Sequence, residues 1–87
     1  MTSCKTIIED MRRNPRNVAF DDAVKVAKAF FGDPVVKGSH HRFRMPWPGD
    51  PRINLQRGKD GKAKPYQIRQ LLNALDRLED ADGPLRG

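Results

Sequence analysis

Residues 38–45 read Gly-Ser-His-His-Arg-Phe-Arg-Met, and the alternation inside this stretch decides the fold. His41, Phe43 and Met45 fall on one face of an extended chain, because successive side chains of a strand point to opposite sides. The polar positions of the opposite face are His40, Arg42 and Arg44. The stretch therefore predicts a β-strand with one apolar and one cationic face.

Two further strands follow from the neighbouring sequence. Residues 52–56 alternate in the same way, with Ile53 and Leu55 apolar and the positions between them polar. Residues 46–51 read Pro-Trp-Pro-Gly-Asp-Pro, a run of turn formers that is typical of a hairpin connection. Val35 and Val36, just before Gly38, predict a short third strand. The result is a small three-stranded antiparallel sheet.

Helical patterns flank these strands on both sides. Residues 3–12 predict a short helix with Ser3 as a possible N-cap, and Asn14-Pro15 should end it. A second helix begins at the acidic pair Asp21 and Asp22, which suits the positive end of the helix dipole, and ends at Gly32. Its predicted apolar face comprises Phe20, Ala23, Val24, Ala27, Phe30 and Phe31.

The last helix carries the clearest periodicity in the chain. It begins at Pro65, a residue that suits a first helical position, and Gly83-Pro84 should end it. Its apolar stripe consists of Ile68, Leu71, Leu72, Leu75 and Leu78. The predicted fold is therefore α+β, with helices packed on the apolar face of the sheet and an N-terminal helical extension.

Composition limits the classes of function. A chain of 87 residues forms one domain with a thin core, so a large cofactor cavity is not expected, and we predict no cofactor. Seventeen Lys and Arg against eleven Asp and Glu give a net charge of +6, and the basic residues dominate positions 37–64. Such a field favours polyanions, of which nucleic acid is the most common.

The cellular setting is also constrained. Cys4 is the single cysteine, which excludes an internal disulfide and a cysteine-based zinc site, and no His, Asp or Glu cluster has convincing metal spacing, so we predict no metal. The sequence has neither an apolar leader segment nor a stretch of about 20 apolar residues, the length needed to span a bilayer. We therefore expect a cytoplasmic protein without a membrane partner.

The alternation separates two adjacent histidines. His41 shares a face with apolar residues, so a structural role near the core is expected. His40 shares its face with cationic and amide side chains, and an imidazole there can transfer a proton near neutral pH while guanidinium groups stabilise charge on phosphoryl oxygens. By this chemistry alone, a merely solvated histidine is the commoner explanation.

Residues 35–44, Val-Val-Lys-Gly-Ser-His-His-Arg-Phe-Arg, resemble the signature of HicA toxins. The resemblance continues through the hairpin, the basic loop 57–64 and the helix that starts at Pro65, and so covers residues 18–79. It implies a double-stranded-RNA-binding-like fold with residues 1–17 as an extension and residues 80–87 as a flexible tail. Residues 1–17 would brace the fold or an antitoxin contact.

The resemblance also implies an activity. HicA toxins are metal-independent endoribonucleases that act on mRNA, are neutralised by a HicB antitoxin, and use the histidine that follows Gly-Ser, which matches His40. Many relatives have a second histidine after the third strand, where this chain has Leu55-Gln56-Arg57-Gly58, so Arg57 or Lys59 would have to stabilise charge instead. Trp47, in an enlarged hairpin, is expected to pack rather than to bind a base or partner.

Three hypotheses follow. In the first, His40 is the catalytic residue of an endoribonuclease, and its predicted RNA-binding residues are Lys37, Gly38, Ser39, Arg42, Arg44, Arg52, Arg57 and Lys59. In the second, the same face belongs to an RNA-binding module without catalysis. In the third, the basic face only docks an acidic protein.

Overall fold

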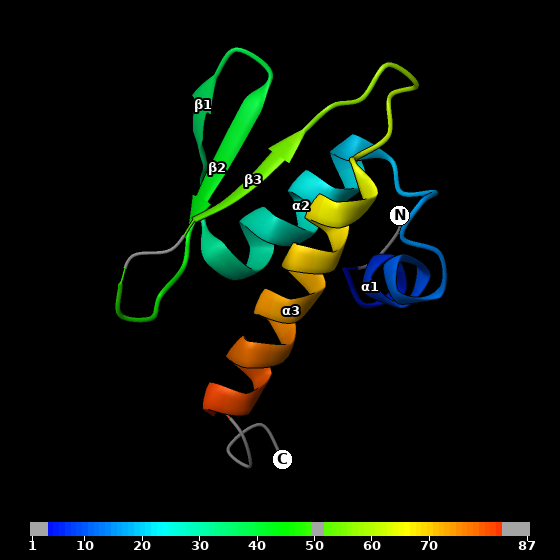
Figure 1. Ribbon diagram of the computed structural model, residues 1–87. Coiled ribbons are helices and arrows are strands. Elements are labelled where there is room, and N and C mark those ends of the chain that lie inside the picture. Colours follow the sequence, from blue (N-terminus) through cyan, green and yellow to red (C-terminus); the bar gives the residue numbers. More distant parts are fainter. Residues whose placement is uncertain (1–3, 50–51, 83–87) are drawn as a thin grey trace.

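The computed structural model describes residues 4–49 and 52–82 and contains the predicted order of elements (Figure 1). The helices and strands are α1 (Cys4–Arg13), α2 (Phe20–Phe31), β1 (Val35–Lys37), β2 (His40–Arg44), β3 (Arg52–Gln56) and α3 (Pro65–Asp82). The α+β class and the three-stranded antiparallel sheet are therefore confirmed.

The strands lie in the order β1-β2-β3, and their register fixes which side chains share a face. His40 lies opposite Lys37 on β1 and opposite Gln56 on β3. Arg42 pairs with Asn54, and Arg44 pairs with Arg52. Directly paired residues of antiparallel strands project to the same side, so these positions define one face, which we call the outer face.

Helices α2 and α3 cover the opposite, inner face of the sheet (Figure 1). Phe43 and Leu55 project from the strands into this layer and are fully buried, as are Ile68 and Leu71 of α3. The outer face therefore remains open because every helix that contacts the sheet does so from the inner side.

Helix α1 does not cover the sheet but packs against α2 and α3. Ile7 and Met11 are buried there, and Arg12 donates to Asp76 of α3 over 2.6 Å. This hydrogen bond raises the pKa of Arg12 above its usual value. Of the two roles predicted for residues 1–17, the described part of this segment serves the first, because it braces the fold. The Ser3 cap lies outside the described residues.

Two details differ from the predicted helical faces and ends. On α2, Val26 is buried instead of Phe30, whose side chain is 40% exposed. Helix α3 runs to Asp82, so residues 80–82 belong to the helix and not to the flexible tail predicted for residues 80–87. Residues 83–87 and the Asp50-Pro51 part of the hairpin lie outside the described residues. No helix in the described part of the chain is both long and apolar enough to cross a membrane.

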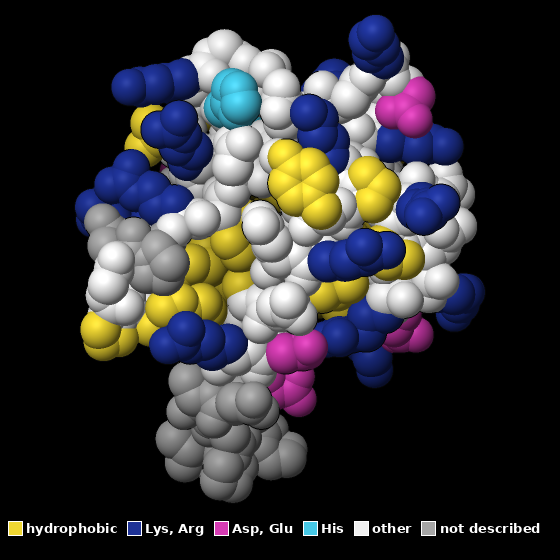
Figure 2. All heavy atoms as spheres, viewed as in Figure 1, with side chains coloured by type: hydrophobic (Ala, Val, Ile, Leu, Met, Phe, Trp, Pro, Cys, Tyr) yellow, Lys and Arg dark blue, Asp and Glu magenta, His cyan; other side chains and the backbone are white. Residues whose placement is uncertain are grey.

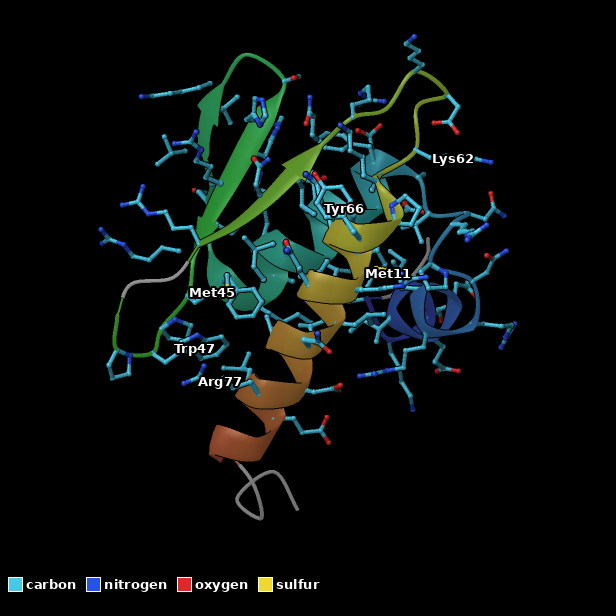
Figure 3. The ribbon with its side chains drawn as sticks, viewed as in Figure 1. Met11, Met45, Trp47, Lys62, Tyr66 and Arg77 are labelled. Carbon is cyan, nitrogen blue, oxygen red and sulfur yellow. The ribbon has the colours of Figure 1, made fainter. Side chains whose placement is uncertain are left out.

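Trp47 packs onto the helices, as predicted. Its ring is half-buried and meets Phe31 edge-on at 6.2 Å between centroids, while the guanidinium carbon of Arg77 lies 4.5 Å from the ring centre (Figure 3). The hairpin is thereby held against α2 and α3.

Candidate active site

The outer face of the sheet is cationic. Its charged strand residues are Lys37, Arg42, Arg44 and Arg52, and the strands place no Asp or Glu beside them. Figure 2 shows Lys and Arg side chains gathered over this side of the molecule, with an imidazole above them. Asp33, at the edge of the face, lies 3.8 Å from Lys28 and lines a shallow hollow of about 300 Å³ with the three arginines. Four cations on one sheet face attract polyanions.

His40 stands at the start of β2 and is held by Asn54 of β3. The imidazole Nδ1 lies 3.0 Å from the amide nitrogen of Asn54 and 3.3 Å from its oxygen. An amide can donate to an unprotonated Nδ1 or, after a flip, accept from a protonated one, so the contact suits either protonation state. The ring is half-buried, and its Nε2 makes no hydrogen bond to any described residue. Nε2 is therefore the nitrogen that a substrate can reach.

Gly38 and Ser39 form the turn that presents His40. Gly38 adopts φ 58°, a left-handed conformation that side chains other than glycine disfavour. Ser39 Oγ accepts a hydrogen bond of 3.4 Å from Gln56 Nε2. This hydrogen bond ties the hydroxyl to Gln56, the cross-strand partner of His40 on β3.

A buried glutamine anchors the far end of β3. Gln67 of α3 is 1% exposed, and its Oε1 accepts from the backbone N–H of Gln56 at 2.8 Å. Its Nε2 donates to the hydroxyl of Tyr66 at 3.4 Å. Helix α3 therefore fixes the strand that carries Asn54 and, through Asn54, the orientation of His40.

His41 lies on the helix side, as the alternation predicts. Its ring meets Phe20 edge-on, with centroids 5.0 Å apart, and its Nδ1 is buried without a hydrogen-bond partner in the described structure. His41 also lines a hollow of about 340 Å³ between the β1–β2 turn and α2. Its surroundings are those of a packed side chain.

Arg57, one of the predicted RNA-binding residues, lies away from the outer face. It donates to Asp21 over 2.7 Å, and its guanidinium carbon lies 4.8 Å from the centre of the Phe20 ring. The reason is the strand period, since position 57 continues the face of Ile53 and Leu55. Arg57 lines the same hollow as His41 and is paired with Asp21, so it does not supply the positive charge that the sequence predicts for it near His40. Lys59 is exposed in the following loop.

The structure thus brings together His40, Ser39 and the cations of the outer face, and it adds residues that were not predicted as part of the site. The alternation of residues 52–56 places Asn54 on this face but does not predict its contact with His40. Gln67 falls four residues before Leu71 on the apolar stripe of α3, and that position is the only signal of its burial.

A scan against models of protein families matches none, and searches among curated proteins and solved structures also find no match. The function is therefore inferred from the geometry of the site and from the resemblance of its motif.

Proposed function

We propose that this protein is an endoribonuclease of the HicA type, the mRNA-cleaving toxin of a type II toxin–antitoxin system. The observation that carries the proposal is the imidazole of His40, which is oriented by Asn54 on a sheet face whose charged strand residues are all cationic. RNA cleavage by its own 2′-hydroxyl needs a general base and positive charge around the phosphate, and an imidazole among guanidinium groups is suited to these two roles.

The reaction uses the ribose next to the scissile bond. Nε2 of His40 takes the proton of the 2′-hydroxyl, and the 2′-oxygen attacks the adjacent phosphorus. The bond from phosphorus to the 5′-oxygen breaks, so the products carry a 2′,3′-cyclic phosphate and a 5′-hydroxyl. The leaving oxygen takes a proton from water, and the hydroxide left behind takes back the proton that His40 holds. The imidazolium that forms keeps an N–H at Nδ1, which the amide oxygen of Asn54 can accept.

The arginines of the outer face hold the phosphate during this step. Arg42 is the closest by register, since it stands two positions after His40 on the same face and opposite Asn54. Arg44 and Arg52 continue the positive surface along the neighbouring phosphates. A guanidinium fork suits phosphate oxygens, and it can stabilise the charge that they gain in the transition state.

The same face accounts for the proposed partner. A HicB-like antitoxin would cover the outer face and block His40, and an acidic surface would be complementary to Arg42, Arg44 and Arg52. The open sheet with helices on one side fits a double-stranded-RNA-binding-like fold, and we place the protein in the cytoplasm with its mRNA.

The test is cleavage of a labelled single-stranded RNA by the purified protein in the presence of EDTA. We expect fragments that end in a cyclic phosphate, and no cleavage when every ribose is 2′-O-methylated. Salt-sensitive binding of both RNAs without any product would replace the proposal with a non-catalytic RNA-binding module. Absence of RNA binding at low salt would favour a surface that docks only an acidic protein.

A further inference from the structure

Tyr66 is an exposed aromatic residue that the core does not explain. Its side chain is 54% exposed, and it is not among the residues of the hydrophobic core. An exposed aromatic ring in a basic setting is the side chain on which single-stranded nucleic acids stack their bases. Tyr66 therefore needs an explanation outside the packing of the fold.

A chain of contacts connects Tyr66 with the outer face near His40. Its hydroxyl accepts from Gln67, and Gln67 accepts from the backbone N–H of Gln56. Gln56 is the cross-strand partner of His40 and donates to Ser39. Tyr66 thus stands just beyond the end of β3 at which His40 lies.

The figures place the ring on the accessible side. In Figure 2 a hydrophobic side chain lies where Figure 3 labels Tyr66, on the same face as an imidazole, with Lys and Arg side chains around it. Lys62 precedes the helix, Arg69 lies one turn after Tyr66, and the first turn of α3 has no acidic residue. An RNA backbone that reaches this side would meet positive charge next to an aromatic surface.

We propose that Tyr66 is a stacking platform for the base of a nucleotide that flanks the phosphate at His40. This inference rests on the proposed function for the position of that phosphate. The RNA strand would run along the arginines of the outer face, pass His40, and place a neighbouring base on the Tyr66 ring. The hydrogen bond from Gln67 holds the phenol and restricts its rotation, which reduces the entropy lost on binding.

The experiment measures binding of a 2′-O-methylated, uncleavable RNA oligonucleotide by fluorescence anisotropy. We expect Tyr66→Ala to weaken binding about 5- to 150-fold, which corresponds to about 1–3 kcal/mol for one stacked base. Tyr66→Phe and Tyr66→Trp should bind within a few-fold of the wild type, because both keep an aromatic face. Phe30→Ala is the control for loss of an exposed aromatic ring, since Phe30 lies on α2, where it lines one hollow with α1 and α3 and another with the hairpin, neither of which includes Tyr66.

A series of oligonucleotides with one abasic position each separates stacking from a loss of structure. For wild type, one abasic position should weaken binding more than the others, and Tyr66→Ala should remove that difference. The proposal is overturned if the alanine variant binds like wild type, or if the abasic profile is the same in both proteins. Cleavage of unmodified RNA by the wild type is measured in parallel. If the wild type cleaves RNA but Tyr66→Ala has the same abasic profile as wild type, the stacking proposal fails and the nuclease proposal stands. If the abasic profile shows stacking on Tyr66 but the wild type cleaves no RNA, the nuclease proposal fails and the stacking proposal stands.

Discussion

Replacement of Gln67 by leucine tests how the helix layer supports the site. Gln67 is 1% exposed and accepts the backbone N–H of Gln56 over 2.8 Å. Leucine has a similar size but no acceptor, so the Gln56 N–H would lose its partner beside a buried apolar side chain. A stranded buried donor costs about 1–3 kcal/mol. In a domain of this size each kcal/mol lowers Tm by about 4–8 °C, so the variant should melt roughly 4–24 °C below wild type.

The assay is thermal unfolding followed by circular dichroism, with amide hydrogen exchange as a local readout. Gln70→Leu is the control, because Gln70 is exposed on the same helix and should change stability by less than about 0.5 kcal/mol. The Gln56 amide should exchange faster in the Gln67 variant but not in the control. Equal melting temperatures for Gln67→Leu and wild type, with the Gln56 amide still protected, would refute the role assigned to this contact.

Three further predictions concern the turn, the partner of His40 and the helix brace. Gly38→Ala should destabilise the fold by about 1–2 kcal/mol in denaturant unfolding, because φ is 58° there and residues with a Cβ disfavour this conformation. The new Cβ would meet no atom within 4 Å, so the loss would come from backbone strain alone, and an unchanged unfolding midpoint would contradict that strain. Asn54→Ala should slow RNA cleavage by up to about 100-fold and mainly through kcat, because the imidazole loses its orientation; an effect confined to KM would argue against this role. Arg12→Met should cost less than about 1 kcal/mol, since both partners of the Asp76 pair are about half exposed. Because the pKa of Arg12 is raised in the fold, this contribution is complete below the ordinary pKa of an arginine side chain and is lost only as the pH rises through the raised pKa. The stability lost in Arg12→Met should therefore be equal at about pH 6 and pH 9 in urea unfolding.

The sheet and its two faces could be predicted because one physical rule governs both. Strand side chains alternate, so Phe43 and Leu55 had to be buried together with the other apolar positions, and His40 had to lie with Arg42 on the opposite side. The same rule, extended by one residue past β3, would have placed Arg57 on the helix side. The error there came from treating residue 57 as part of a loop.

Contacts between distant segments could not be predicted in this way. The pairing of Arg57 with Asp21 depends on where α2 begins relative to the end of β3, and the bond from Gln67 to Gln56 depends on how α3 approaches the sheet edge. Both are tertiary relations that local periodicity does not encode. The burial of Val26 in place of Phe30 has the same origin, because α1 and α3 determine which side of α2 is covered.

The central claim is that His40, and not its neighbour His41, performs the chemistry. The direct measurement is the single-turnover cleavage rate of one labelled RNA by wild type, His40→Ala and His41→Ala at equal folded concentration. We expect His40→Ala to cleave about 10²–10⁴-fold more slowly with an unchanged Tm, the usual effect of removing a general base, and His41→Ala to keep the wild-type rate within a few-fold but melt at a lower temperature. Wild-type cleavage by His40→Ala, or its loss in a folded His41→Ala, would contradict the account.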